Sequence, residues 1–573
     1  MEIKKLTTDV VVVGGGGAAC RAAIEVSEKG LDCIMLDKGR PGRSGATPCA
    51  LWSIQAPMGL KGRDERDTPD QFFEDMVKAG RFIGDQNITE VVAFTAVERI
   101  LDMEKYGVNF QKYDDGRFYQ TPMPGQTYPR SCFMIENGQH MSTVLAGEAA
   151  RRDNISIFKD FFVFDLLKSG SSVVGVVGMD MISGQVVAVN AKSTVIATGG
   201  YTSLWGFSDN PPTLTGDLLS GAFRAGADIV DLEFNQYYGT DVIWPPSVRG
   251  TVVLYELMID EFADGEIRDK TGKPIIDKPL PIRDEAIKTI FNVIREGRGT
   301  PHGGVYFDTT KSPKGEEAVR DVFSSMTPKH YQFLIDAAGI DLAKEPLEVA
   351  PASHYQCGGI YVNERGQSVV DGLYACGEVA GNFQGANRLA GSALCDTQTT
   401  GARCGDSAAE DAKGRGLIEI DDKDLKKKTE IIDDFLSSKK NKPTRPVFIK
   451  EQVLKTMDEF IAPYRDEKGM TKGLSVLQSL RDEVKKISVP DTGKYNLELR
   501  EAIETNLMLD AAELTFGSAL FRKESRGHHN RFDYPETDDK NWRCHTIAYL
   551  DGDEMSFKQR DVIYTKLKPE DAK

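Results

Sequence analysis

The sequence predicts an α/β fold in which a Rossmann-like nucleotide-binding domain is interrupted by an inserted α+β domain and followed by a helical domain. Three observations predict this fold. A buried valine strand runs into a glycine turn and a helix within residues 9–39. A glycine-rich, buried texture returns at 351–412, after a stretch with more aromatics, prolines and charged turns. Apolar residues at helical spacing dominate the chain from 425 to 525.

The length of 573 residues predicts two to four domains. We expect the nucleotide-binding domain to span 1–230 and to resume at 352–412, on either side of an inserted domain at 231–351. A charged linker at 413–424 then leads into the helical domain, for which we expect residues 425–535. Residues 536–573 are predicted to form a C-terminal tail.

The first strand, turn and helix carry a dinucleotide fingerprint. The pattern Gly14-x-Gly16-x-x-Ala19 follows the strand and opens the helix, and Asp37 ends the next strand about 20 residues later. Gly14 makes the tight turn, and Gly16 lets backbone amides approach a pyrophosphate at the helix N-terminus. Asp37 can accept hydrogen bonds from ribose hydroxyls. The sequence therefore predicts a dinucleotide site here.

Two further glycine-rich strand ends favour FAD over NAD. They are "IATGG" at 196–200 and "YACGE" at 374–378. A cofactor as long as FAD needs several close backbone approaches along its length, and glycine permits them. Glu378, at the end of its strand, is expected to bind the ribityl hydroxyls.

Composition excludes several other classes. The net charge of −16 disfavours nucleic acid as a partner. No run approaches the length of a membrane span, and the N-terminus lacks the long apolar region of a signal peptide, so we expect a cytoplasmic protein. The nine cysteines form no CxxC, so we expect neither an Fe–S cluster nor another metal on this chain.

Motifs spread over most of the chain, in matching order, resemble the flavoprotein subunits of the fumarate reductase and succinate dehydrogenase superfamily. This group also includes L-aspartate oxidase and the adenylylsulfate reductase flavoprotein. The motifs include "VVVGGGGAACRAA" (11–23), "RSGAT" (43–47), "TGDLLSGAFRAGADIVDLEFNQ" (215–236), "HYQCGGI" (354–360), "GLYACGEVAG" (372–381) and "GANRLAGSAL" (385–394).

The resemblance implies an FAD domain, a capping domain over the flavin and hydride exchange between the flavin and a small substrate. It implies an FAD site lined by Gly14, Gly16, Gly17, Ala18, Asp37, Lys38, Gly39, Ser44, Gly45, Ala46, Thr47, Val163, Ala197, Thr198, Gly199, Asp217, Glu378, Arg388, Ala393 and Leu394. It also implies that His354 and Arg388 hold a substrate carboxylate. Arg388 offers a fixed fork of donors for an oxyanion, and His354 can polarise the adjoining oxygen.

Four departures from the family pattern concern the flavin link and the substrate. The segment "RSGAT" lacks the histidine that bonds covalently to FAD in membrane-bound members, so we expect non-covalent FAD. Tyr238 stands where dicarboxylate enzymes have a substrate-binding histidine. The motif that supplies Thr and Glu is not recognisable, with Glu256 as a possible remnant. Lys288 stands at the position that corresponds to the proton-donating arginine; a lysine can serve as a general acid, and Arg283 and Arg298 are neighbouring alternatives.

These losses fall on the side that would hold a second carboxylate. We therefore predict an FAD-dependent oxidoreductase acting on a substrate with one anionic group, or on a dicarboxylate held differently, with reaction at a C=C bond. The alternatives are an electron-relay subunit without a substrate of its own and an adenylylsulfate reductase-like enzyme. Because the chain has neither CxxC nor a nicotinamide fingerprint, a separate Fe–S subunit is the expected electron partner.

Overall fold

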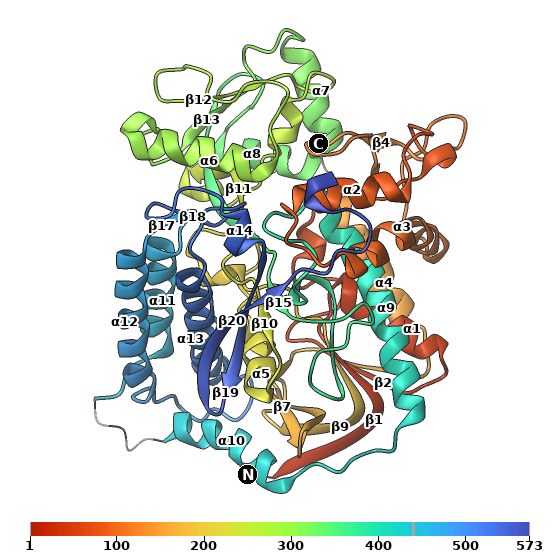
Figure 1. The fold of residues 1–573 in the computed structure, drawn as a ribbon, viewed down its shortest axis with the longest axis vertical. Coiled ribbons are helices and arrows are strands. Elements are labelled where there is room, and N and C mark those ends of the chain that lie inside the picture. Colours follow the sequence, from red (N-terminus) through yellow and green to blue (C-terminus); the bar gives the residue numbers. More distant parts are fainter. Residues whose placement is uncertain (1, 438–439, 441, 572–573) are drawn as a thin grey trace.

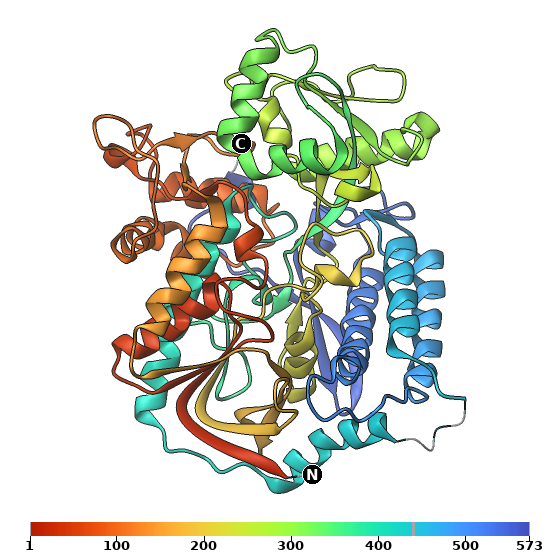
Figure 2. The same cartoon turned by 180° about the vertical axis from the view of Figure 1, so that it is seen from behind.

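The computed structural model describes residues 2–437, 440 and 442–571. The chain forms three packed parts (Figure 1). The FAD-binding part lies around one large sheet, the capping part sits at one end of the molecule, and a group of long helices flanks the FAD-binding part on one side. Figure 2 shows the same arrangement from behind, with the helices α1, α4 and α9 running along the outer face of the large sheet.

The large sheet has β1 near its centre, flanked by parallel strands on both sides. Val10 of β1 lies opposite Cys33 on one side and opposite Ser193 on the other. Because both faces of these strands are covered, the segment Val10–Val13 is buried and apolar throughout, which is typical of parallel sheets. In spatial order the strands are β6 (Ile155–Phe158), β2 (Cys33–Leu36), β1 (Ile3–Val13), β9 (Val186–Ile196), β8 (Ser172–Asp180) and β7 (Phe161–Ser169), with β16 (Leu373–Ala375) also pairing with β9.

Close approach of two helices brings distant parts of the FAD-binding chain together. The first helix, α1 (Gly17–Glu28), packs along α9 (Ser392–Gly414). A Cβ on Gly405 of α9 would lie 2.4 Å from the carbonyl oxygen of Ala22, so only glycine permits this contact. The start of α9 thereby reaches the glycine turn at residues 14–16. The other elements of this part are η1 (Thr47–Cys49), α2 (Pro69–Ala79), α3 (Gln86–Tyr106), α4 (Asn137–Ala150), α5 (Asp217–Ala225) and a small sheet of β3 (Ser53–Gln55), β5 (Ser131–Phe133) and β4 (Gln120–Thr121).

The capping part has its own antiparallel sheet and its own core. The strands, in order, are β11 (Asn235–Trp244), β14 (Leu347–Gln356), β13 (Val305–Asp308) and β12 (Glu266–Arg268), and the helices are α6 (Arg283–Val293), α7 (Glu316–Met326) and α8 (Pro328–Ala338). Strand β14 leads back into the FAD-binding part and carries His354 near its end. The pairing of β11 with β14 is irregular between Tyr238 and Asp241, where the two parts meet.

The C-terminal part is helical, as its apolar spacing predicts. Its helices are α10 (Asp422–Leu436), α11 (Pro446–Phe460), α12 (Glu467–Val484), α13 (Leu497–Phe521) and α14 (Asp539–Trp542), with β17 (Tyr464–Arg465) pairing β18 (Asn530–Arg531). Across the described residues, none of the helices combines the length and the apolar character that a membrane crossing requires.

The residues predicted to form a tail instead include an ordered hairpin. Strands β19 (Cys544–Asp551) and β20 (Glu554–Asp561) pair with each other, and β19 also pairs with β10 (Ile229–Val230), which pairs with β15 (Gly359–Ile360). The hairpin therefore closes a sheet made from three distant segments. Short strands such as β10 and β15 give no pattern long enough to reveal this pairing from the sequence.

A buried ionic cluster fixes this hairpin to the FAD-binding part. His545 of β19 lies with its Nδ1 2.6 Å from Asp231 Oδ2 and its Nε2 3.1 Å from Asp85 Oδ1, and all three side chains are buried. Burial alone lowers the pKa of His545, but the two carboxylates outweigh burial and raise that pKa to about 10. The histidine is therefore a cation that compensates two buried acids.

We expect His545→Leu to lower the free energy of unfolding by about 3–5 kcal/mol, because it leaves the buried Asp85 without a cation and leaves Asp231 with only Arg522, 3.7 Å away. In the wild type the contribution should be complete below the unfolded pKa of about 6.5 and should be lost as pH rises toward 10. Denaturant unfolding of both proteins between pH 6 and 10 measures this difference. His302→Leu, at a histidine whose side chain is 38% exposed, is the control and should change stability little; equal losses in both variants would contradict the assignment.

Candidate active site

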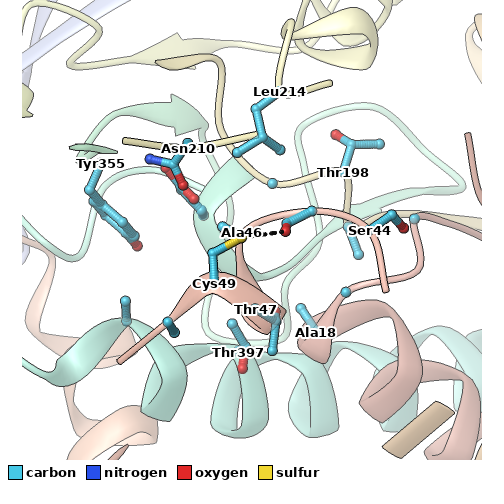
Figure 3. A pocket seen from close by; sticks show the side chains of 18 of the residues that line it. Ala18, Ser44, Ala46, Thr47, Cys49, Thr198, Asn210, Leu214, Tyr355 and Thr397 are labelled. Carbon is cyan, nitrogen blue, oxygen red and sulfur yellow. Dashed lines mark hydrogen bonds between the residues drawn. The ribbon is translucent and has the colours of Figure 1, made fainter. Parts of the chain in front are cut away.

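One elongated cavity runs from the glycine turn after β1 to the junction with the capping part. Figure 3 shows Ala18, Thr47 and Thr397 on one side of it and Asn210 and Leu214 on the opposite side. Cys49 lies between them, with its Sγ 4.0 Å from the carbonyl oxygen of Gly45. Walls come from β1, β2, the loop after β9, β14 and the start of α9. The cavity therefore collects segments from the whole FAD-binding part and the base of the cap.

The glycine turn fits a dinucleotide. A Cβ on Gly14 would lie 2.2 Å from the carbonyl oxygen of Ala197, and one on Gly15 would lie 2.3 Å from Asp37 Oδ2, so side chains here would fill the cradle. Asp37 accepts a hydrogen bond from the Ser44 hydroxyl at 2.6 Å, and burial raises the pKa of its carboxyl group. One carboxylate oxygen remains for ribose hydroxyls, as the fingerprint requires.

Lys38 and Asp217 line the same cavity but are bound to each other. The Lys38 ammonium lies 2.7 Å from Asp217 Oδ2 and 3.0 Å from Glu504 Oε1. Burial lowers the pKa of Lys38, but the two acids outweigh it, and the pKa is raised. The lysine therefore ties the cavity wall to helix α13 and has no free charge to offer a second ligand.

Glu378, for which the sequence predicts contact with the ribityl chain, lines the same cavity. Its Oε1 accepts a hydrogen bond from the Gln356 amide at 3.0 Å. A Cβ on Gly200 would lie 2.2 Å from the same oxygen, so the glycine gives this side chain its room. Burial raises the pKa of Glu378 to about 7. A buried carboxyl group with a second, free oxygen suits hydroxyl donors.

The structure brings nearly all predicted FAD residues to this one cavity. Those that line it are Gly14, Gly16, Ala18, Asp37, Lys38, Gly39, Ser44, Gly45, Ala46, Thr47, Val163, Ala197, Thr198, Gly199, Asp217, Glu378, Arg388, Ala393 and Leu394. Gly17 is not among them, because its amide is turned to the Thr47 hydroxyl at 3.0 Å. The residues present fit FAD, which would lie along this cavity.

At the cap end, His354 and Arg388 lie in contact. Arg388 Nη2 donates to His354 Nε2 at 3.1 Å, and His354 Nδ1 donates to Asp209 Oδ2 at 2.5 Å. Burial and the two nearby arginines lower the pKa of His354, opposed by Asp209. In the described part of the chain no Asp or Glu oxygen lies within 4.0 Å of the Arg388 guanidinium. Arg388 is thus a buried cation without a carboxylate of its own.

Arg283, at the start of α6, lines the same cavity, and its charge acts on both His354 and Arg388. Its Nη2 is 3.4 Å from Glu256 Oε1, its Nη1 donates to Gln236 Oε1 at 3.2 Å, and its guanidinium carbon lies 4.9 Å from the centre of the Tyr238 ring. The Tyr238 hydroxyl donates to Glu256 Oε2. Arg283, Tyr238 and His354 all line the cavity. Glu256, a possible remnant in the sequence, is therefore built into the site as the partner of Arg283.

The placement of Lys288 disagrees with the role that the sequence predicts for it. Lys288 is exposed and lines a separate surface cavity together with Arg81 and Arg526. Arg298, the other alternative, is bound to Asp269 and Glu296 at the cap surface. Of the three candidates for proton transfer, only Arg283 reaches the main cavity. The placement therefore favours Arg283 as the candidate for proton transfer.

Several lining residues were missed by sequence reasoning. Asp209 and Asn210 sit in a polar turn that resembles any surface loop, and Asn210 donates to the His354 carbonyl at 2.7 Å. Tyr355 lies beside Arg388, with 4.3 Å between its ring centre and the guanidinium carbon, and its hydroxyl donates to Asp396. The sequence marks two of these residues only by their position beside a family motif. Tyr355 follows His354, and Asp396 lies two residues after "GANRLAGSAL".

Comparison with known proteins agrees with this geometry. Two family models match: an FAD binding domain over residues 9–394 and the fumarate reductase flavoprotein C-terminal domain over residues 450–573. A curated relative, a subunit of the fumarate reductase (CoM/CoB) of Methanothermobacter marburgensis, is 36% identical over 549 residues, covering 94% of this chain and 96% of the relative. The chain belongs to the fumarate reductase and succinate dehydrogenase flavoprotein family. It is an FAD-dependent oxidoreductase of that family.

Two solved structures define how far the likeness extends. A mutant FrdA chain of the E. coli quinol fumarate reductase superimposes with a TM-score of 0.90 at 27% identity, over 99% of this chain and 98% of that chain. Adenylylsulfate reductase from Archaeoglobus fulgidus superimposes with a TM-score of 0.80 at 22% identity, over 99% and 97% of the two chains. At that lower identity the likeness to adenylylsulfate reductase shows the shared fold alone.

Proposed function

We propose that this flavoprotein subunit exchanges hydride between bound FAD and a small carboxylate substrate at a C=C bond. The observation that carries the proposal is Arg388. It is buried beside His354 at the end of the cofactor cavity, and no carboxylate of the described chain lies within 4.0 Å of it. A buried guanidinium without a counter-charge is an anion site.

Arg388 would hold the carboxylate, and His354 would position the guanidinium, because its Nε2 accepts from Arg388 and carries no proton to donate. Burial and the nearby charge of Arg283 lower the pKa of Arg388 to about 10, so it stays charged at neutral pH. Asp209 accepts from His354 Nδ1 and fixes the ring, which leaves Nε2 facing Arg388. A bound carboxylate would accept hydrogen bonds from the guanidinium N–H groups of Arg388, including the one that is now donated to His354. Asp209 and His354 therefore preset the arginine for an oxyanion.

Arg283 would supply the proton. FAD, when bound and reduced, supplies the two electrons as hydride, and saturation of a C=C bond needs one proton in addition. Arg283 lines the same end of the cavity and is in contact with Glu256, whose other oxygen accepts from Tyr238. After transfer, Glu256 would take up a proton that originates from solvent and pass it to Arg283. The reverse direction, oxidation of the saturated acid, uses the same groups.

The relay alternative lacks this support. A subunit that only passes electrons needs the flavin cavity but no anion site. In such a protein a buried arginine is expected to pair with a carboxylate of the same chain. Here Asp396 is close enough for its charge to act on Arg388, but it forms no ion pair with the arginine, and its Oδ2 accepts from the Tyr355 hydroxyl at 2.7 Å and the Gln384 amide at 2.8 Å. The adenylylsulfate reductase-like alternative rests on fold alone. We therefore favour the carboxylate enzyme.

We further propose that the electron partner is a separate Fe–S protein of the same complex. The relative from M. marburgensis carries the name of one component of a larger fumarate reductase, and this chain has no CxxC motif for a cluster of its own. Purification of the complex and iron analysis of the partner would test this part.

We expect FAD to be bound without a covalent link, because no histidine stands in the segment 43–47. Precipitation of the native protein with trichloroacetic acid should release all flavin into the supernatant. Cys49, which lines the cavity, gives this experiment a second outcome. Flavin that stays with the pellet in the wild type and is released from Cys49→Ser would contradict the prediction and identify a thioether.

The proposed function is tested by photoreducing the FAD under anaerobic conditions and adding candidate oxidants. Rapid reoxidation by an unsaturated carboxylate, lost in Arg388→Gln, is the expected result. If no unsaturated carboxylate reoxidises the flavin while an Fe–S protein does so rapidly, the relay function replaces this proposal. Rapid reoxidation by adenylylsulfate alone would favour the sulfur enzyme.

A further inference from the structure

The cap end of the cavity has an apolar side. We define the apolar wall as Leu51, Met123, Val252 and Leu254, which all line the cavity. Trp52, Met123 and Leu254 belong to the core of the capping part, and Leu51 and Val252 pack against it. The wall is therefore the cavity-facing surface of a packed core, which holds its shape.

Hydrogen bonds fasten the wall beside the carboxylate site. The segment 252–255 pairs back onto β11: the Val253 amide donates to the Thr240 carbonyl at 3.2 Å, and the Tyr255 amide donates to the Tyr238 hydroxyl at 3.1 Å. The Tyr238 ring in turn lies 5.1 Å from the His354 ring. Val252 and Leu254 are thus placed next to the groups that hold the carboxylate.

Met123 approaches the same end from the FAD-binding part. Its loop packs so closely that a Cβ on Gly125 would lie 3.0 Å from both Ile282 and Leu389. These two residues adjoin Arg283 and Arg388 in the sequence. The loop that carries Met123 therefore packs against the two segments that hold these arginines, and Met123 lines the cavity with them.

The charges at this end suffice for one carboxylate. Three Lys or Arg side chains line the cavity within the described residues, namely Lys38, Arg283 and Arg388. Lys38 is compensated by Asp217 and Glu504, and Arg283 by Glu256. Only Arg388 is left for an anion. A second carboxylate would lie against the apolar wall without a cation, and an unpaired buried charge is strongly unfavourable.

We propose, building on the proposed function above, that the substrate is a 2-enoic monocarboxylic acid, or its saturated counterpart in the reverse direction, whose far end is alkyl or aryl. Its carboxylate binds Arg388, which His354 positions, and its hydrocarbon end packs on the apolar wall. The wall sets the specificity, because it accepts apolar surface and rejects the second carboxylate of fumarate or succinate.

Binding of saturated acids tests the proposal without turnover. Butyrate, 3-phenylpropionate and succinate are titrated into the oxidised holoenzyme, and the flavin absorbance change and the shift in Tm are recorded. We expect at least one of the two monocarboxylates to bind about 100-fold more tightly than succinate, which is the order of effect that leaving a buried polar group unpaired produces. The photoreduced enzyme should likewise be reoxidised faster by crotonate or cinnamate than by fumarate.

A variant of the wall should reverse this preference. Leu254→Arg adds a cation where the second carboxylate would lie and should raise the ratio of succinate to butyrate affinity by about tenfold or more. Leu60→Arg, at a leucine that is 80% exposed, is the matched control and should leave the ratio unchanged. FAD content and Tm report whether each variant folds. If Leu254→Arg does not fold, the titration of the wild type with the three acids still tests the proposal.

The outcomes separate this inference from the proposed function. If succinate binds the wild type more tightly than both monocarboxylates, and fumarate reoxidises it fastest, the substrate class is wrong while the carboxylate enzyme stands. If none of the acids binds or reoxidises the flavin, both are wrong. If the monocarboxylates win but Leu60→Arg alters the ratio as much as Leu254→Arg, the wall does not set the specificity.

Discussion

Replacing Arg388 with glutamine is expected to lower kcat/KM for the carboxylate substrate by about 30- to 5,000-fold, since removing one partner of a buried charge pair costs about 2–5 kcal/mol. Glutamine keeps a hydrogen-bond donor but removes the cation that the substrate needs. The affinity for a saturated acid should fall by a similar factor. Stopped-flow reoxidation of the photoreduced flavin and equilibrium titration measure the two quantities.

Arg388→Lys separates charge from geometry. The lysine keeps the positive charge but loses the planar fork of donors. The kcat/KM of Arg388→Lys should therefore lie between those of the wild type and of Arg388→Gln. Arg388 also donates to the Leu389 carbonyl and lies over the Tyr355 ring, so FAD content and Tm must be measured in both variants. Full turnover in a folded, flavin-loaded Arg388→Gln protein would remove the anchor of the proposed site.

The cofactor side of the site could be predicted from the sequence because its signals are local. Gly14, Gly16 and Asp37 fall within one strand–turn–helix–strand unit, and the spacing alone places them on one surface. Ala197 and Glu378 stand at the ends of strands β9 and β16, which pair in parallel, so their ends meet at one edge of the sheet. Parallel pairing makes such predictions reliable over long sequence separations.

The substrate side was harder because it depends on the packing of the cap. The apolar wall gathers Leu51, Met123 and Leu254 from three segments with no shared motif. The turn that holds Asp209 gives no sign of its contact with His354, 145 residues away. Contacts of this kind depend on how two domains close, which no local pattern records.

Helix geometry explains why Arg283, and not Lys288, lies at the cavity. Both residues belong to α6 (Arg283–Val293), five positions apart. Residues on a helix follow one another at about 100°, so five positions place the two side chains about 140° apart around the axis. They cannot both face the cavity. Both basic residues stand in the sequence motif, and burial, which puts Arg283 inside and Lys288 on the surface, favours Arg283.

That difference leads to the second large effect. We expect Arg283→Gln to lower kcat by about 10²- to 10⁴-fold, the usual contribution of a proton donor, while the affinity for a saturated acid changes much less. The reason is that Arg283 is paired with Glu256 and does not provide the free charge that holds the carboxylate. Single-turnover reoxidation gives the chemical step, and titration with butyrate or succinate gives the binding.

Lys288→Gln is the matched control on the same helix. Lys288 faces the surface cavity beside Arg81 and Arg526, so this variant should keep the wild-type rate. Arg283→Lys adds a further test, because a lysine beside Glu256 keeps a transferable proton and should recover part of the rate that glutamine loses. A loss of kcat in Lys288→Gln with a normal rate in Arg283→Gln would return proton transfer to the lysine. A parallel loss of binding and rate in Arg283→Gln would instead make Arg283 a second carboxylate ligand, and a dicarboxylate substrate would then fit the cavity.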